Sequence, residues 1–464
     1  MNKIMVFIPY ILFFNLLYAN AVAKTPLIPP HETALPKEYI HGDKLDVYPT
    51  KVKELTSGRG IKFWFMKDNS APLVHVKIAF KNSGAAHQEK TKAGIPIFYS
   101  NAVFCGSGKY SKTQFAEECS NLSLIIRCKA DFDRMYFSLT IPKIVLDKSV
   151  AIFNALITLP NFENDKVKII QNEIVSYLQN YAMDSSGIAS HSIIPSIIFK
   201  SHKYESGIFG SPEDFMQLSV EDLKNYKAKF LVTSNVEACV FGDISESEAT
   251  LLIDKIFSGV EDGKPSPDNI ADVVPQLNSE IKKYYAEGPQ SLILFVLKTE
   301  RPRSIKRHAA MLLYKILGEG YIFKGRILSK LRTEKGLIYS GAVHHIDWNH
   351  SSYVLGKLQT DNSKVLDTIN LLKTIVKDLR EKGINESELQ FAKRNVKGSI
   401  LVNLRTSENL CNFYFNKKLF GFDLNALSET IEKINGVILK EVNTLANSIL
   451  DENNMSFVVI GGKK

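Results

Sequence analysis

The chain of 464 residues repeats one pattern twice, and this internal repeat constrains its fold more than any other feature. Gly106 and Gly325 each follow an apolar helical stretch, and they lie 219 positions apart. Gly242 and Gly461 each follow an apolar strand-like stretch, and they are also 219 positions apart. One equal spacing would be weak evidence, but equal spacings at both ends of a matching pattern predict an internal duplication.

The same succession of elements is predicted in both halves. Each half has an apolar helix, an alternating strand, an amphipathic helix, a helix with an acidic first turn, and a strand that ends in glycine. The paired ranges are 97–104 and 316–323, 135–141 and 352–358, 150–159 and 366–376, 163–179 and 385–401, and 237–243 and 456–462. Because strands come as hairpins with helices between them, we expect an α+β fold with two homologous domains, each an antiparallel sheet covered by helices.

Domain boundaries follow from the repeat and from local composition. We expect an N-terminal domain at residues 45–257 and a C-terminal domain at 275–464. Residues 258–274 are rich in glycine, proline and acidic side chains, which is typical of a linker.

The first residues predict a secretory signal peptide over 1–23. Lys3 provides a short basic start, residues 4–18 are almost all apolar, and residues 19–23 offer small side chains for cleavage. The apolar run is shorter than about 18 residues and contains Pro9, which argues against a membrane anchor. We therefore expect an exported protein, periplasmic in a Gram-negative bacterium, with no stable membrane span.

Charge and cysteine content exclude some classes of protein. The formal net charge is +9, but the lysines are spread along the chain, so no nucleic-acid-binding stripe is predicted. A mildly basic exported protein favours acidic peptides or a membrane surface, although only weakly. The cysteines are odd in number and form no C-x-x-C motif, so at least one is free and no disulfide framework is indicated; they are Cys105, Cys119, Cys128, Cys239 and Cys411.

Three segments give the duplicated pattern a resemblance to a known family. They are the helical stretch at 94–104, LSKLRTEKGLIYSG at 328–341 and GINESELQFAKRNVKGSI at 383–400. Over roughly residues 45–464 the chain resembles the pitrilysin/insulinase family of zinc metallopeptidases, which includes the mitochondrial processing peptidase subunits. The resemblance implies that the two domains form a half-shell, one half of a clamshell, and that paired half-shells enclose unfolded peptides.

The resemblance also locates the family's zinc motif, H-x-x-E-H, on the first apolar helix. In that motif two histidines one turn apart bind zinc, and the glutamate activates the water. The matching positions here are Ile97, Ser100 and Asn101. Isoleucine has no lone pair and serine is no carboxylate base, while a single carboxylate elsewhere does not hold catalytic zinc. We expect no hydrolysis at this site and no metal bound by this chain.

A further zinc-binding glutamate of the family falls on Glu173, which is still a glutamate here. As a remnant ligand it would have lost its partners. Because its helix opens with Glu163 and Asp165, an ordinary solvated helix-forming glutamate is the other interpretation.

Other segments offer no replacement for the metal site. HKYES at 202–206 lacks a closing histidine, and GSGKYS at 106–111 lacks the spacing of a phosphate-binding loop. His344, His345 and His350 are close in sequence, but the first two would face opposite sides of a strand. We interpret them as surface or strand histidines, with metal binding as the alternative.

The second half keeps a pair of residues that the family directs at its substrate. Arg332 and Tyr339 stand in L-R-x-x-x-G-L-x-Y-S and match the family's Arg/Tyr pair. A guanidinium and a phenol are hydrogen-bond donors that can hold a peptide carbonyl and stabilise its developing oxyanion. The alternative is an ordinary surface arginine and a strand tyrosine.

Loss of the zinc motif together with retention of the Arg/Tyr pair predicts a particular kind of subunit. In the family's two-chain members, one subunit carries zinc and the other carries the pair. We therefore expect a non-catalytic, substrate-binding subunit of an exported heteromeric zinc peptidase, with zinc and H-x-x-E-H on a partner chain and peptides as substrates. One alternative is an inactive structural or peptide-binding protein, for example a homodimer. Another is an active peptidase with a displaced metal site.

Overall fold

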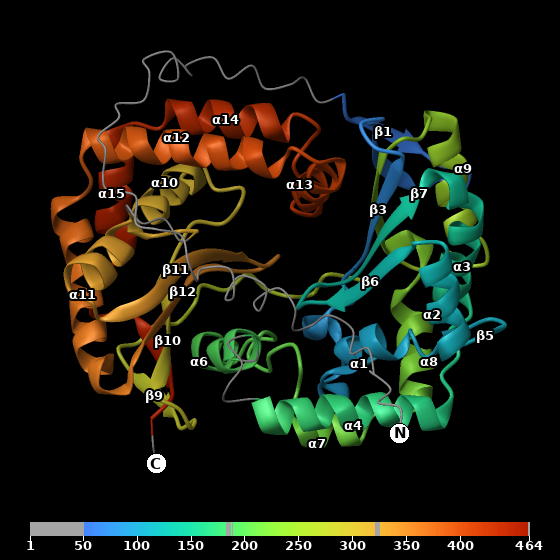
Figure 1. The fold of residues 1–464 in the computed structure, drawn as a ribbon, viewed down its shortest axis with the longest axis horizontal. Helices are drawn as coiled ribbons and strands as arrows, with labels where there is room; N and C mark the ends of the chain where they lie inside the picture. The colour runs from blue at the N-terminus through green and yellow to red at the C-terminus, as the bar shows by residue number, and fades with distance from the viewer. Residues whose placement is uncertain (1–50, 182–186, 188, 321–324, 463–464) are drawn as a thin grey trace, which may run out of the picture. The chain divides into compact units, whose positions relative to one another are not determined.

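The structure, a computed structural model, describes residues 51–181, 187, 189–320 and 325–462 (Figure 1). The signal peptide predicted at 1–23 lies outside the described residues. None of the helices in the described part of the chain is long and apolar enough to cross a membrane.

Two large sheets of the described residues share one strand order. The N-terminal sheet is ordered β1 (Lys53–Thr56), β2 (Lys62–Lys67), β8 (Val236–Gly242), β3 (Leu73–Lys81), β7 (Arg134–Pro142) and β6 (Ile125–Ala130). The C-terminal sheet is ordered β11 (Ile338–Asp347), β12 (Ser352–Asp361), β10 (Gln290–Lys298), β13 (Ser456–Ile460) and β9 (Ile281–Tyr284). The order β2-β8-β3-β7-β6 corresponds strand by strand to β9-β13-β10-β12-β11, which confirms the predicted duplication.

The sheets are antiparallel in most of their pairs but not throughout. β2 runs parallel to β8, and β9 runs parallel to β13. The predicted α+β fold with antiparallel sheets is confirmed, and each half adds one parallel pair. A parallel pair requires a long crossover between its strands, and almost the whole of each half lies within that crossover.

Helices pack against both sheets. In the N-terminal half they are α1 (Ile95–Ala102), α2 (Lys112–Asn121), α3 (Leu146–Thr158), α4 (Asn164–Tyr181), α6 (Ile194–Ile198), α7 (Pro212–Met216), α8 (Val220–Phe230) and α9 (Glu246–Ile256). In the C-terminal half they are α10 (Arg307–Leu317), α11 (Val365–Lys382), α12 (Glu386–Asn403), α13 (Ser407–Leu419), α14 (Ala426–Gly436) and α15 (Leu439–Ile449). Figure 1 shows α3 and α9 beside the N-terminal sheet and α11 beside the C-terminal sheet. A short hairpin, β4 (Gly106–Ser107) and β5 (Tyr110–Ser111), precedes α2.

One predicted helix is misplaced. The sequence pattern predicted a helix at 316–323, but α10 ends at Leu317 because Gly318, with a φ of 146°, leaves the helical conformation. Residues 321–324 lie outside the described residues. The true start was missed because Arg307 is charged, although its side chain is largely buried and binds both carboxylate oxygens of Asp347 at 3.0 and 2.7 Å.

Each half contributes a helix to the sheet of the other half. α13, which follows the long helix α12, packs on the N-terminal sheet and places Tyr414 between Trp64 and Phe241, with ring centroids 6.2 and 5.8 Å apart. α6, which follows the long helix α4, packs against β13, and the next residue, Phe199, contacts Tyr353 at 5.9 Å between centroids. Side chains of both halves therefore meet in one of the two hydrophobic clusters of the described residues, and the second cluster belongs to the C-terminal half.

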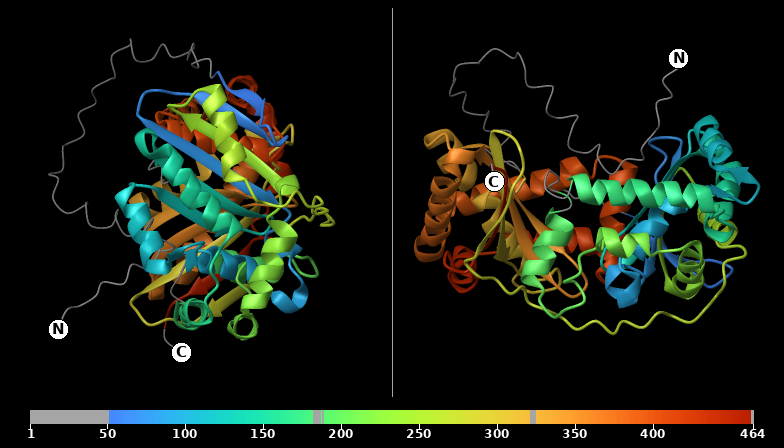
Figure 2. Two further views of the ribbon diagram at one scale, coloured as in Figure 1. Left: turned by 90° about the vertical axis from the view of Figure 1, so that its right-hand side faces the viewer. Right: turned by 90° about the horizontal axis from the view of Figure 1, so that it is seen from below.

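The segment between α9 and β9 carries no helix or strand, yet it is fixed along its length (Figure 2). We call residues 258–280 the connecting strap. The backbone N–H of Ser266 donates to Oδ1 of Asn235 at 2.8 Å, and that of Val273 donates to the carbonyl of His350 at 2.8 Å. Although its composition is that of a linker, the strap is hydrogen-bonded to both halves.

Candidate functional site

The helix α1 carries the three positions of the degenerate zinc motif. It begins after Gly94, whose φ of 86° is left-handed and whose N–H donates to Oε1 of Gln88 at 2.9 Å. Phe98 anchors the helix against Phe215, with ring centroids 6.0 Å apart. α1 also packs against α4, α8 and β6, so this helix is held firmly from several sides.

The side chains at the three motif positions make contacts within the protein's own structure. Ile97 is buried in the core. The hydroxyl of Ser100 donates to the carbonyl oxygen of Ile97 at 2.9 Å, and Nδ2 of Asn101 donates to the same oxygen at 2.8 Å. Both polar side chains therefore bond to the backbone of their own helix. These three positions supply no imidazole and no carboxylate, and one further carboxylate does not make a catalytic zinc site, so the residues do not fit the family's zinc.

Glu173 lies on α4, which contacts α1, and its side chain is exposed. Burial, and to a smaller extent nearby carboxylates that include Glu173, raise the pKa of the Cys105 thiol to about 11. The Glu173 carboxylate therefore lies within electrostatic reach of the end of α1. Its position is compatible with a remnant ligand and also with a solvated helix residue.

Cysteines and histidines do not form a second centre. All five cysteines are free thiols, and no group of three or more His, Cys, Asp or Glu residues among those described is placed to hold a metal ion. His344 and His345 alternate on β11, where Nδ1 of His345 lies 3.0 Å from Oε1 of Glu319. The surface interpretation of His350 is wrong, because this side chain is buried just before β12.

Arg332 and Tyr339 lie close in the chain at one edge of the C-terminal sheet. Arg332 is exposed on a π-helical turn, Leu328–Glu334, and Tyr339 is the second residue of β11. The Tyr339 side chain is 49% exposed, and its hydroxyl donates to Oδ2 of Asp361 at 2.8 Å. This hydrogen bond raises the pKa of the phenol and fixes the direction of the ring.

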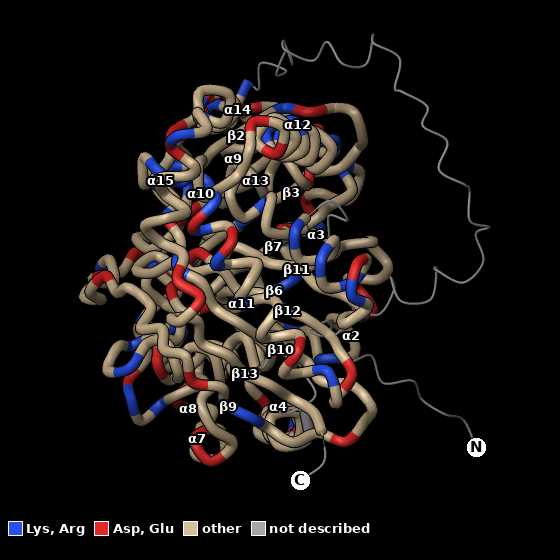
Figure 3. The backbone as a smooth tube through the Cα atoms, turned by 90° about the vertical axis from the view of Figure 1, so that its left-hand side faces the viewer, with Lys and Arg blue, Asp and Glu red and all other residues tan. Residues whose placement is uncertain are grey.

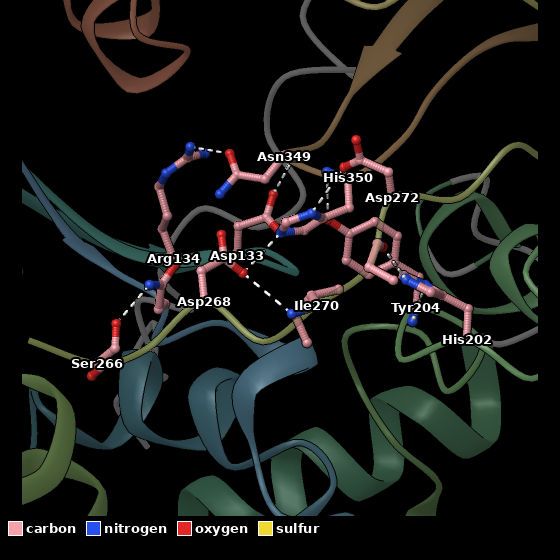
Figure 4. Close-up of polar contacts among 12 residues, drawn as sticks. Asp133, Arg134, His202, Tyr204, Ser266, Asp268, Ile270, Asp272, Asn349 and His350 are labelled. Carbon is pink, nitrogen blue, oxygen red and sulfur yellow. Dashed lines mark hydrogen bonds and ion pairs between the residues drawn. The ribbon is translucent and has the colours of Figure 1, made fainter.

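A buried polar cluster joins the two halves (Figure 4). At its centre, Asp133 accepts hydrogen bonds from the hydroxyl of Tyr204 at 2.6 Å and from the backbone N–H of Asn349 at 2.7 Å. Burial first, and then the neighbouring Asp131 carboxylate, raise the pKa of Asp133 to about 6. Arg134, from the same turn, donates to the side chain of Asn349.

The connecting strap closes this cluster from outside. Nε2 of His350 lies 3.0 Å from Oδ1 of Asp268, and Nδ1 lies 3.2 Å from Oδ1 of Asp272. Arg301 forms an ion pair with Asp272. Sequence reasoning missed these residues because they are dispersed along the chain, and only the acidic composition of the strap pointed to an ionic role.

Charges elsewhere are interspersed. In Figure 3, the positions of Lys and Arg alternate with those of Asp and Glu over the helices and loops of the view, without a continuous basic stripe. Specific recognition of a ligand would therefore depend on local groups of charged side chains rather than on the net charge.

Comparison with known families agrees with the two-domain fold. Residues 65–209 match Insulinase (Peptidase family M16), and residues 217–396 match the Peptidase M16 inactive domain. Together these matches span well over half of the chain, so the chain belongs to peptidase family M16. Its first helix, α1, carries none of the three residues of the H-x-x-E-H motif, since the matching positions are Ile97, Ser100 and Asn101.

Similar proteins include inactive members of the family. The "Non-peptidase homolog YmxG" of Helicobacter pylori is 20% identical over 402 residues, which cover 86% of this chain and 91% of that protein. The crystal structure of a peptidase M16 inactive domain from Pseudomonas fluorescens superposes with a TM-score of 0.81 at 19% identity, covering 89% of this chain and 98% of the other. A protease structure from Helicobacter pylori gives a TM-score of 0.78 at 15% identity, covering 89% and 100%.

Gly94 tests how firmly the start of α1 is fixed. A Cβ at this position would lie 2.3 Å from the carbonyl oxygen of Phe209 and 2.4 Å from the ring of Phe215, in a left-handed conformation. We expect Gly94→Ala to lower the free energy of unfolding by about 2–4 kcal/mol in urea denaturation. The control is Gly398→Ala in α12, where a Cβ meets no atom within 4 Å and about 0.5–1 kcal/mol of stabilisation is expected. Equal effects of the two substitutions would contradict this account.

Proposed function

We propose that this chain is the non-catalytic, substrate-binding subunit of an exported, heteromeric zinc peptidase. A partner chain of the same family, with an intact H-x-x-E-H helix, supplies the zinc, the water and the general base. This chain supplies peptide-binding surface together with Arg332 and Tyr339. The observation that carries the proposal is the contrast between α1, whose motif residues are bonded to their own helix, and the Arg/Tyr pair, which is exposed.

The chemistry of the pair supports this role. A guanidinium and a phenol donate hydrogen bonds, and such donors can stabilise an oxyanion that develops on a peptide carbonyl. Neither group needs a metal on its own chain to do so. The Tyr339 hydroxyl donates its single proton to Asp361, which holds the ring in place, and it would exchange this hydrogen bond for one to the peptide carbonyl when a substrate binds.

The edge of the N-terminal sheet offers a place for a peptide. Within the residues that the structure describes, β6 pairs with β7 alone and ends the sheet. Unpaired backbone groups of an edge strand can accept an extended peptide as an additional strand. Because β6 contacts α1, such a peptide would pass close to the helix that carries the degenerate motif.

A reconstitution experiment tests the proposal. The zinc-bearing family chain from the same organism, mixed with this protein, is expected to cleave an unfolded peptide much faster than either chain alone. Arg332→Ala and Tyr339→Phe are each expected to lower kcat/KM of the mixture by about 10- to 100-fold, since each removes a donor to the reacting carbonyl. Arg405→Ala and Tyr285→Phe, at other exposed positions, serve as matched controls and should leave kcat/KM unchanged.

The outcome separates the proposal from its alternative. If the zinc-bearing chain alone cleaved the peptide as fast as the mixture, the heteromeric proposal would be wrong. Isolation of this protein from the exported fraction as a homodimer, with no zinc-bearing chain bound, would instead support a structural or peptide-binding role.

A further inference from the structure

The outer strand β6 has one basic face. Its residues alternate, so that Ile125, Arg127 and Lys129 are exposed on one side of the strand. Ile126 and Cys128 lie on the opposite side and pack against the core. Residues on one face of a strand recur about every 6.6 Å, so the two cations are spaced as the alternate side chains of a paired strand would be.

Arg127 is only loosely neutralised within the described residues. Its guanidinium lies 3.8 Å from Oε1 of Glu408 and keeps 57% of its side chain exposed. The same oxygen lies 3.9 Å from Nζ of Lys77, so one carboxylate serves two cations. Glu408 belongs to the first turn of α13, the helix that packs on this sheet. The grouping therefore keeps an excess of positive charge.

Lys129 is the second exposed cation of this face, two residues beyond Arg127. Its Nζ is 5.1 Å from the ring centroid of Tyr136 on β7. Burial, then the Lys357 ammonium, and more weakly Lys129, lower the pKa of His191 to about 4, against the opposing effect of the Asp131 carboxylate. Asp131 is an acid of the same hairpin. Its two carboxylate oxygens accept hydrogen bonds from two backbone N–H groups and from the Tyr136 hydroxyl.

We propose that the β6 edge selects extended peptide segments with carboxylates at alternate positions, of the form acidic-x-acidic. A peptide added to β6 as a strand would place its same-face side chains directly opposite Arg127 and Lys129. Opposite charges at such cross-strand positions attract, whereas a basic segment would meet like charges. This inference rests on the proposed peptide-binding function and adds the substrate class.

Peptide binding to the purified protein tests the inference without a partner chain. Three labelled peptides of equal length are compared by fluorescence anisotropy: one with glutamates at alternate positions, one with the glutamates adjacent, and one with glutamines in their place. We expect the alternating peptide to bind roughly tenfold more tightly than the glutamine peptide, the size expected for two partly exposed ion pairs. The adjacent arrangement should fall between them, because one of its carboxylates faces away.

Variants assign the preference to the two cations. Arg127→Gln combined with Lys129→Gln should abolish the preference, and Glu408→Gln should enlarge it by removing the competing carboxylate. Lys377→Gln, a charge loss at an exposed position of α11, is the matched control and should keep the preference. Equal binding of all three peptides, or a preference that persists in the double variant, would overturn the inference while leaving the proposed function intact. Failure of every peptide to bind would overturn both.

Discussion

Replacement of Tyr414 by alanine is expected to lower the free energy of unfolding by about 3–5 kcal/mol, the range found when a large aromatic side chain is removed from a core. Tyr414 is fully buried between Trp64 and Phe241, although it comes from a helix of the other half of the chain. Its removal leaves a cavity where α13 packs on the N-terminal sheet. Urea denaturation followed by far-UV circular dichroism measures the change.

A control substitution and the number of unfolding transitions test this prediction further. Tyr285→Ala removes the same atoms from a side chain that is 48% exposed and should cost less than about 1 kcal/mol. Because α13 and α6 each pack on the opposite sheet, the two halves of the wild-type protein should unfold together in one transition. Two separate wild-type transitions, or equal losses in the two variants, would contradict the shared core.

Acidification from pH 6.5 to pH 4 is expected to destabilise the protein through its buried histidines. Burial lowers the pKa of His87 to about 4 and that of His191 to about 4, from an ordinary value of 6.5. Between these pH values the unfolded chain binds more protons than the folded one, so stability falls as the pH falls. Each histidine then contributes a loss on the order of 3 kcal/mol by pH 4.

One buried acid acts in the opposite direction. The pKa of Asp133 is raised to about 6 from 3.8, so the folded state binds more protons there and stability rises as the pH falls through that window. This gain offsets roughly one of the two histidines. His308, whose pKa burial also lowers to about 4, adds a loss in the same direction as the other two histidines. The net direction is a loss of stability toward pH 4.

A neutral substitution isolates the histidine contribution from the titration of other groups. In His87→Gln combined with His191→Gln, neither side chain can become charged, so the fall in unfolding free energy between pH 6.5 and pH 4.5 should be clearly smaller than in the wild type. Chemical denaturation at a series of pH values provides the comparison. An unchanged pH dependence in the double variant would show that these histidines do not titrate with the lowered pKa.

Much of the fold could be predicted from the sequence because its hydrophobic pattern is periodic and occurs twice. The equal glycine spacings and the alternating strands led to two homologous α+β domains, and the matching strand orders confirm them. The pattern failed at the helix predicted for 316–323, where Arg307 begins the true helix in a buried ion pair. A charged residue that is buried because it has a partner elsewhere cannot be recognised from its neighbours in sequence.

The candidate site divides in the same way. The loss of ligands at Ile97, Ser100 and Asn101 could be read directly, because coordination chemistry depends on residue type. The roles of Glu173, Arg332 and Tyr339 stay predictions, since their chemistry depends on a partner chain. The basic face of β6 was not predicted, although the alternation of Ile125, Arg127 and Lys129 is visible in the sequence, because an edge strand is recognised only from its pairing.

By itself, the sequence determined that the chain is duplicated, that each copy combines helices with strands, and that the family's metal site is lost. These properties are local, since they depend on periodicity and residue type. Only the tertiary structure decided that α13 and α6 are exchanged between the halves, that the connecting strap is bonded to both, and that β6 ends its sheet. Such contacts join residues far apart in the chain, and their energies depend on burial and pairing that no local pattern contains.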